Sequence, residues 1–377
     1  MEKFQSGVKI NLDNLISNYR VIKKKVKGKK VIPVIKADAY GHGAEICAKI
    51  LMEEGADLFA VSSVYEAMCL RDYGIDADIL ILGYVPDRKI NKIIDNDIIP
   101  TIYNLDFANK LNEEAEKKNK KVKVHIKINT GMNRLGFNKN EIDEAFKVLK
   151  GLDNLIYEGL FSHFATSDEI DKSYSKKQFD IFEYAVKKSK EYELGITIYH
   201  ISNSAAITDL DEYSLDAVRA GIVLYGVYPS EVKPKINPYK PVMSFYTTIT
   251  NIFHIDKYET VGYGRTFTAM DKTKVAVMCV GYADGYNRKL SNKGEVLING
   301  KYKAKVIGNV CMDMTMIEIP ENADINIGDN VEIFGENINI SSLADICETI
   351  PYELLCCINK RVKREYILNG KTEEFEI

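Results

Sequence analysis

Short apolar segments rich in β-branched residues recur along the first two thirds of this 377-residue chain. They contain few polar positions, which is typical of strands buried on both faces of a parallel sheet. Eight such segments occur, at residues 31–37, 57–63, 77–83, 98–103, 122–129, 155–163, 197–203 and 217–226. The pattern therefore predicts eight strands.

Segments with helical periodicity and charged faces separate most of these strands. Examples are residues 44–54, 107–118, 141–149 and 174–193. Strands and helices that alternate eight times predict a (β/α)8, TIM-like barrel of the α/β class. An open, doubly wound sheet is the alternative, because strand order cannot be read from one sequence. The number of units favours the barrel.

The pattern changes near residue 227. Residues 228–241 hold four prolines and show no helical period, as expected of a linker. Beyond it, alternating apolar and polar segments punctuated by Gly and Asn predict an all-β domain. We therefore expect a cofactor-binding barrel over residues 1–236 and a C-terminal β domain over residues 237–377. Residues 1–12, with the apolar stretch 8–12, are a candidate strand partner for that β domain.

Composition narrows the function classes. The net charge is −3 with both signs interspersed, which gives no electrostatic reason to expect nucleic acid or an anionic membrane as partner. No apolar run approaches the ~20 residues that cross a bilayer, and the N-terminus has no signal-peptide core. The seven cysteines show no CxxC pair and the five histidines no metal-ligand spacing. We expect a cytoplasmic protein without a metal site.

Polar side chains gather where the predicted barrel strands end. Because the carboxyl ends of barrel strands converge, these side chains are expected to form one site. They are Lys36, Tyr40 and His42 after the first strand, Lys127, Asn129 and Arg134 around the fifth, His163 after the sixth, His200, Asn203 and Ser204 after the seventh, and Arg219 and Gly221 at the eighth.

Lys36 lies at the end of an apolar run, where its side chain is expected to be buried. A buried lysine tends to be neutral, and a neutral amine attacks carbonyl groups. Such a lysine can hold pyridoxal phosphate as a Schiff base. Ser204 and Gly221 follow the two strands where barrels usually bind phosphate, and Arg219 is the nearest candidate partner for the pyridine nitrogen. A lysine that merely reaches solvent, and an arginine that merely forms a salt bridge, remain open on spacing alone.

Eight motifs in order resemble the alanine racemase family. They are VIKADAYGHG, INTGMNRLGF, SHFATSD, ISNSAA, VRAGIVLYG, VGYGRTFTA, VGYADGY and GNVCMDMTMIEI, and the match runs from about Val8 to Tyr366. The resemblance implies a pyridoxal phosphate-binding barrel, a C-terminal β domain and a homodimer with active sites shared between subunits. It also implies interconversion of L- and D-alanine, with D-alanine supplied for peptidoglycan.

The resemblance also implies residue roles. Lys36 would bind the cofactor and act as base for the D-enantiomer, and Tyr263 of the partner subunit would act as base for the L-enantiomer. Arg219 would face the pyridine nitrogen, and His163 would hydrogen-bond the tyrosine. The remaining cofactor contacts implied are Tyr40, Asn203, Ser204, Gly221 and Ile222. Those implied for the substrate are Arg134, the Met312 backbone and the entrance residue Tyr282, and Lys127 matches a lysine that is often carbamylated.

Three positions depart from the family pattern. Asn129 stands where Asp is common, Asn309 where an entrance arginine is common, and Lys360 where a tyrosine is common. Asn309 and Lys360 motivate an alternative, a serine or broad-range racemase of the same family. Two further readings, a non-catalytic cofactor carrier and a decarboxylase, fit less well. The carrier lacks a β domain and a second base, and no decarboxylase motif is evident.

Overall fold

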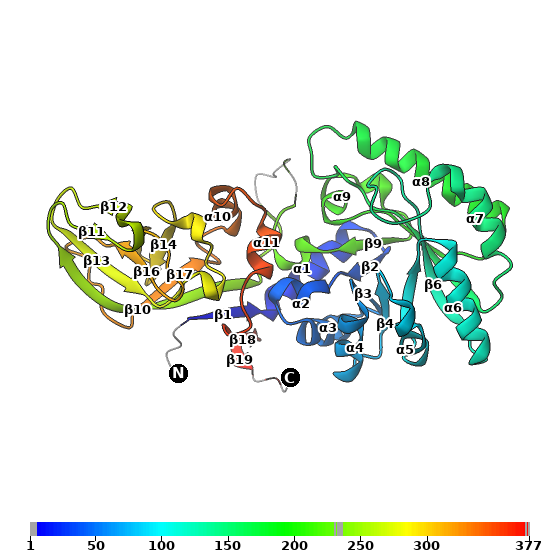
Figure 1. The fold of residues 1–377 in the computed structure, drawn as a ribbon, viewed down its shortest axis with the longest axis horizontal. Helices are drawn as coiled ribbons and strands as arrows, with labels where there is room; N and C mark the ends of the chain where they lie inside the picture. The colour runs from blue at the N-terminus through cyan, green and yellow to red at the C-terminus, as the bar shows by residue number, and fades with distance from the viewer. Residues whose placement is uncertain (1–5, 230, 232–236, 374, 376–377) are drawn as a thin grey trace. The chain divides into compact units, whose positions relative to one another are not determined.

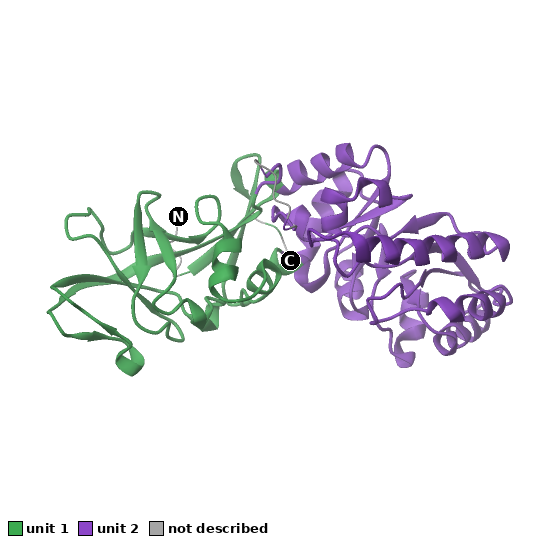
Figure 2. Cartoon of the chain, turned by 90° about the horizontal axis from the view of Figure 1, so that it is seen from above, with its two compact units in different colours: residues 1–14, 40–42, 241–376 green, residues 15–39, 43–240, 377 purple. Residues whose placement is uncertain are grey.

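The computed structural model describes residues 6–229, 231, 237–373 and 375. The chain forms two compact units, shown in two colours in Figure 2. The barrel unit comprises residues 15–39, 43–240 and 377, and the β unit comprises residues 1–14, 40–42 and 241–376. Residues 230 and 232–236 of the predicted linker, and residues 1–5 of the candidate N-terminal strand, lie outside the described residues.

Eight parallel strands among the described residues form the barrel (Figure 1). They are β2 (Lys30–Pro33), β3 (Leu58–Val61), β4 (Asp78–Ile81), β5 (Ile99–Ile102), β6 (Val122–Lys127), β7 (Leu155–Phe161), β8 (Ile198–His200) and β9 (Ala217–Ala220). Strands β3 to β8 pair in chain order, and β2 pairs with β9. A bridge between Val34 and Ala60 links β2 to β3, and the Asp216 N–H donates to the Tyr199 carbonyl at 3.1 Å beside β8. The predicted barrel is therefore confirmed.

The helices of this region pack apolar faces against the strands. They are α1 (Leu12–Lys25), α3 (Ala44–Glu53), α4 (Val64–Asp72), α5 (Ile90–Asp95), α6 (Leu105–Lys117), α7 (Ile142–Leu149), α8 (Ser173–Glu191) and α9 (Ser204–Asp209). Helix α7 buries Ile142, Ala145, Phe146 and Leu149, the spacing of one helix face. A side-chain cap fixes the start of α6, where the Asn104 side chain accepts from the Phe107 N–H.

The eighth apolar run is only partly a strand. Strand β9 ends at Ala220, and Ile222–Tyr225 form the 3₁₀ helix η4. Gly221, with φ −97° and ψ −114°, breaks the strand geometry between them. The chain thus turns immediately after Arg219, where the sequence pattern alone predicts continued strand.

The β unit is built on a closed ring of six antiparallel strands. They are β10 (Met243–Ile255), β13 (Thr273–Met278), β14 (Glu295–Ile298), β15 (Tyr302–Val306), β16 (Thr315–Glu318) and β17 (Asn330–Phe334). The ring closes because β10 pairs with β17 over residues 245–248 and with β13 over residues 249–255, with a register shift between Ile249 and Asn251. This is the antiparallel β architecture that the sequence predicts.

Further elements extend the ring. Strand β1 (Ser6–Asn11) pairs antiparallel with β10 and parallel with β18 (Lys363–Leu368), and β19 (Lys371–Glu373) follows β18. A small hairpin pairs β11 (Thr260–Val261) with β12 (Phe267–Thr268). Two short helices, α10 (Ile340–Ile346) and α11 (Pro351–Cys356), also belong to this unit. The all-β pattern does not anticipate them, since helices this short show little periodicity.

A left-handed turn follows the first barrel strand. Residues 37–41 of α2 (Lys36–Gly41) all have positive φ, between 52° and 83°, and only the last is glycine. This conformation costs roughly 1–2 kcal/mol for each non-glycine residue. The Asp38 carboxylate accepts from the Ala44 N–H at 2.9 Å, and the Ala37 N–H donates to Glu66 Oε1 at 2.8 Å. Strained backbone of this kind clusters at functional sites, and here it begins at Lys36.

Candidate active site

Arg219 occupies the centre of the barrel site. It is 3% exposed, and its Nη2 donates to the carbonyls of Ser162 at 2.7 Å and Ile201 at 2.9 Å and to His163 Nδ1 at 3.1 Å. Its Nη1 donates to His200 Nδ1 at 2.8 Å. Within the described part of the chain, Arg219 Nε forms no hydrogen bond. The guanidinium is thus fixed by its two terminal nitrogens, with one N–H donor left over.

Positive charge gathers around this arginine. Burial and then the charge of Arg134 lower the pKa of Arg219 to about 9, which leaves it charged at neutral pH. Lys127, on β6, is buried with its Nζ 4.4 Å from the centre of the Phe161 ring. Burial, then Arg219 and Arg134, hold the Lys127 pKa well below its usual range. Lys127 is therefore poised to be a neutral amine.

The pKa of His163 shows that several of the predicted residues lie near one another. Its pKa lies well below the usual range, first through burial and then through the charges of Arg219, Lys127, Arg134 and Lys36. Four basic side chains from separate parts of the barrel sequence therefore lie near one imidazole. These five residues that the sequence singles out share one region.

The motif that carries Ser204 and the motif that carries Gly221 lie side by side. Ser204 Oγ accepts from the backbone N–H groups of Gly221 at 3.0 Å and Val223 at 3.4 Å. Asn203 caps α9 by accepting from the Ala206 N–H at 3.1 Å. The starts of α9 and η4 therefore lie together, and backbone N–H groups at helix starts have no partner within their helix. This arrangement suits an anion such as phosphate.

Tyr40 belongs to the β unit by its contacts. Its ring centre lies 6.0 Å from that of Tyr352, on α11. Burial, then Tyr352 and Cys356, raise the pKa of the Tyr40 phenol. The phenol is therefore neutral and can donate a hydrogen bond.

Tyr263 lies in a short loop of the β unit. Its side chain is 75% exposed, so packing within this chain does not hold the ring. The backbone is fixed instead: Asn309 Nδ2 donates to the Tyr263 carbonyl at 2.6 Å. Gly262 and Gly264 have φ of 70° and 73°, and a Cβ on Gly262 would lie 2.9 Å from Met316 Cε. Asn309, a departure from the family pattern, thus anchors the loop that carries Tyr263.

Met312 and Tyr282 are adjacent in the same unit and exposed. The Tyr282 N–H donates to the Cys311 carbonyl and the Ala283 N–H to the Met312 carbonyl, both at 3.0 Å. The Met312 N–H has no hydrogen-bond partner in the described part of the chain. Arg361 braces the loop by bonding Asp284 at 2.8 Å and Asp313 at 2.7 Å.

Two further departures can be placed. Asn129 donates from Nδ2 to Asn133 Oδ1 at 3.0 Å and Asn138 Oδ1 at 2.8 Å, so it shapes the loop that precedes Arg134. Lys360 is exposed in the β unit, next to Asn359, whose Oδ1 accepts from the Arg361 N–H at 3.0 Å.

Sequence reasoning missed two residues linked to this site. His125 lies inside β6 and contacts His200, and Glu158 on β7 contacts His125. A histidine in the middle of the apolar run 122–129 was the available signal.

No helix among the described residues combines the length and apolar character needed to cross a membrane. The same residues hold no group of three or more His, Cys, Asp or Glu arranged to bind a metal ion.

Comparison with known proteins finds relatives over nearly the whole chain. Residues 10–229 match the family model for the alanine racemase N-terminal domain, and residues 242–366 that for the C-terminal domain. Alanine racemase 2 of Caldanaerobacter subterraneus subsp. tengcongensis is 45% identical over 370 residues, or 97% of this chain and 95% of that protein.

Solved structures give the same result. The alanine racemase of Clostridium difficile 630 is 39% identical with a TM-score of 0.93, covering 99% of this chain and 98% of that one. The alanine racemase of Bartonella henselae, solved with covalently bound pyridoxal phosphate, is 29% identical with a TM-score of 0.89, covering 97% of this chain and 100% of that one.

Proposed function

This chain belongs to the alanine racemase family, and we propose that it interconverts L-alanine and D-alanine with pyridoxal phosphate as cofactor. The observation that carries the proposal is the buried Arg219, whose Nε donor has no partner among the described residues. An arginine in this place can donate to a pyridine nitrogen but cannot readily protonate it. An unprotonated pyridine nitrogen makes the cofactor a weaker electron sink. This limits side reactions such as transamination and therefore suits racemisation.

The residues present fit this cofactor. Ser204, Gly221 and Ile222, together with Asn203, would hold the phosphate beside two helix starts, and the neutral Tyr40 phenol would donate to it. Lys36 would hold the cofactor covalently through its amine. When bound, pyridoxal phosphate supplies an electron sink for negative charge that develops at the substrate Cα.

Two bases on opposite faces of Cα invert the configuration of the substrate. We assign Lys36 Nζ to the Cα proton of D-alanine and Tyr263 Oη to that of L-alanine. When one base removes the proton, the other delivers a proton to the opposite face. Since His163 Nδ1 accepts from Arg219, its own proton sits on Nε2, where it can donate to the phenolic oxygen of the partner subunit's Tyr263.

The substrate carboxylate would be bound by Arg134 and by the Met312 N–H, with Tyr282 at the entrance. We propose that Lys127 is carbamylated and pairs with Arg134. Its lowered pKa favours this reaction, in which the neutral amine forms a bond to the carbon of CO2 and releases a proton. The resulting carbamate would place a negative charge among the cations of the barrel site.

We propose that the enzyme is a homodimer in which each active site combines two subunits. The exposure of Tyr263 (75%) and Met312 (53%) supports this, because residues that act on a bound substrate need a covering surface. The barrel domain, residues 1–236, would bind cofactor, and residues 237–377 would complete the partner's site. We further propose a cytoplasmic location, with D-alanine used for peptidoglycan; none of the seven cysteines, all among the described residues, is in a disulfide.

A substrate panel tests the proposal. Purified protein saturated with pyridoxal phosphate is given L-alanine, L-serine and other L-amino acids, and the enantiomers are separated by chiral chromatography. We expect alanine to dominate and the Lys36→Ala variant to be nearly inactive. Serine racemised as fast as alanine would favour the broad-range alternative and implicate the Lys360 region. Racemisation of neither amino acid would contradict the proposed function.

A further inference from the structure

A line of hydrogen bonds crosses the barrel interior and leaves the proposed active site. It begins at Arg219 Nη1, which lies 2.8 Å from His200 Nδ1. His200 Nε2 lies 2.9 Å from His125 Nδ1, and His125 Nε2 lies 3.2 Å from Glu158 Oε2. Both histidines are 0% exposed. Four strands, β9, β8, β6 and β7, each contribute one member.

The chemistry of the ends fixes the direction of every bond. A guanidinium only donates and an ionised carboxylate only accepts. His200 therefore accepts on Nδ1 and donates from Nε2, and His125 must accept on Nδ1 and donate from Nε2 to Glu158. Both imidazoles are neutral, since a proton on either Nδ1 would face another donor. The line is a fixed, polarised connection from a cation to an anion.

Electrostatics and packing support this arrangement. Burial and the charge of Arg219 hold the His200 pKa well below its usual range. Burial also lowers the His125 pKa, although Glu158 opposes that shift. Phe161 stacks on the His200 ring at 4.9 Å.

Gly159 leaves the space that His125 fills. A Cβ on Gly159 would lie 2.3 Å from His125 Nδ1, so any side chain there would displace the imidazole. Strands β6 and β7 also shift register between Val124 and His125, beside this glycine. The backbone is therefore shaped around the histidine.

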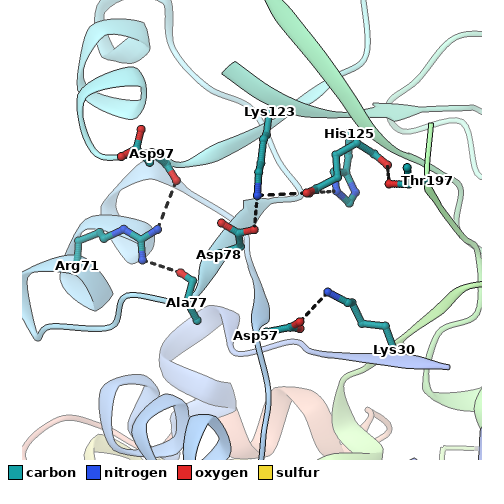
Figure 3. Close-up of polar contacts among 10 residues, drawn as sticks. Lys30, Asp57, Arg71, Ala77, Asp78, Asp97, Lys123, His125 and Thr197 are labelled. Carbon is teal, nitrogen blue, oxygen red and sulfur yellow. Dashed lines mark hydrogen bonds and ion pairs between the residues drawn. The ribbon is translucent and has the colours of Figure 1, made fainter. Parts of the chain in front are cut away.

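The far end of the line is anchored by a second charge pair. Glu158 Oε1 lies 3.3 Å from Lys123 Nζ, which lies 2.7 Å from Asp78 Oδ2. Thr197 donates from its N–H to the Glu158 carbonyl at 3.1 Å. Figure 3 shows Lys123 and Asp78 beside His125 and Thr197. Hydrogen bonding to His125 is the first cause that lowers the Glu158 carboxyl pKa, so the group is ionised.

We propose that Glu158 is a positioning residue for the racemase reaction, acting on Arg219 through His125 and His200. By accepting from His125, Glu158 holds both imidazoles so that His200 Nδ1 faces Arg219 Nη1. This fixes the guanidinium plane and aims its unpaired Nε at the cofactor site. No proton moves along the line. The inference rests on the proposed function and adds a residue that the family resemblance does not name.

A purely structural role is the competing explanation, because ion pairs are common at this end of the barrel. Lys30 and Asp57, also drawn in Figure 3, form such a pair at 2.9 Å. No hydrogen bond in the described residues joins that pair to Arg219. Asp57→Asn is therefore the matched control: it removes an ion pair in the same region and leaves the line intact.

The first test compares Glu158→Ala, Glu158→Gln and Asp57→Asn as holoenzymes. Loss of a residue that orients a metal ligand typically costs about 10- to 100-fold, and we expect a fall of similar size in alanine kcat for Glu158→Ala, because Glu158 orients Arg219 in the same indirect way. The KM should change little. Glu158→Gln retains an acceptor and should recover most of the rate, and Asp57→Asn should resemble the wild type. A kcat for Glu158→Ala equal to that of Asp57→Asn would overturn the proposal.

The second test needs no activity and keeps the proposal testable if Glu158→Ala does not fold. In wild-type holoenzyme labelled with ¹⁵N-histidine, His125 and His200 should be neutral, with protonated Nε2 and bare Nδ1. Glu158→Gln should preserve these signals. A proton on Nδ1 of either residue would overturn the assigned direction. Because this spectrum is independent of turnover, it separates failure of the inference from failure of the proposed function.

Discussion

The barrel unit and the β unit each carry part of the proposed active site, and they hold those parts differently. Arg219 is 3% exposed and is gripped by five hydrogen bonds from its terminal nitrogens. Tyr263 is 75% exposed, and Asn309 fixes only its backbone, by a hydrogen bond to its carbonyl. The barrel unit buries its functional groups, whereas the β unit presents its own outward on a firm backbone.

The difference indicates how work is divided. Groups that tune a cofactor must be dry and immobile, because low polarity strengthens their electrostatic effect. A base that serves another subunit's site must instead project from the surface that carries it. Neither part would suffice alone, so activity should depend on bringing a barrel unit of one subunit to the β unit of another.

The strongest test of this division places the Lys36 and Tyr263 substitutions in different subunits of one dimer. Lys36→Ala and Tyr263→Phe homodimers should each be nearly inactive. A heterodimer of the two variants, isolated through two different affinity tags, should contain one intact site and one doubly damaged site. We therefore expect about half of the wild-type activity per dimer, the share set by two-fold symmetry.

Heterodimers of two Lys36→Ala subunits with the same tags provide the control and should stay inactive. If the mixed heterodimer is as inactive as its parents, Lys36 and Tyr263 act within one subunit. The shared-site proposal would then be wrong, although the racemase function would stand.

A second experiment separates the two bases by face. In Tyr263→Phe, Lys36 can still remove and return the Cα proton of D-alanine, whereas L-alanine has lost its base. Exchange of the L-alanine Cα hydrogen with D2O should fall about 10²- to 10⁴-fold, the usual contribution of general base catalysis. Exchange of the D-alanine hydrogen should fall much less.

Proton NMR of each enantiomer incubated with the variant gives both rates, and Tyr258→Phe, at an exposed tyrosine of the β unit outside the proposed site, is a matched control. Equal losses for L- and D-alanine would contradict the assignment of one base to each face.

Sequence patterns predict much of the barrel because its strands are buried on both faces. Runs such as residues 57–63 and 77–83 have polar residues only near their ends, and β3 and β4 lie within them. The left-handed turn at residues 37–41 could not be predicted, since four of its five residues are not glycine. Tertiary contacts such as that of Ala37 with Glu66 impose it, and these are not local in sequence.

The site shows the same limit. Lys36, His163 and Arg219 stand at strand ends, where polar residues attract notice, and the family motifs supply their expected roles. His125 and Glu158 stand inside strands, and only the three-dimensional pairing of β6, β7 and β8 reveals that they reach Arg219. Tyr263 is far from the barrel in sequence, and no pattern in the residues themselves links it to Lys36.

The smallest expected effect is a pH dependence of the unfolding free energy that arises in the barrel unit. His125, His163 and His200, all in the barrel unit, have pKa values lowered by burial. Below about pH 6.5 the unfolded chain binds protons on these residues, whereas the folded chain resists binding them. The unfolding free energy should therefore fall as the pH falls, by up to about 1.4 kcal/mol per pH unit for each histidine until the folded pKa is reached.

Urea unfolding followed by circular dichroism, at fixed protein concentration between about pH 7.5 and about pH 5.5, measures this slope while ordinary carboxyls stay ionised. A flat profile would mean that the barrel histidines take up protons as easily folded as unfolded. Since a proton on Nδ1 of His200 would oppose Arg219, that result would also break the hydrogen-bonded line, and the contrast between a dry barrel site and an exposed β-unit site would lose its basis.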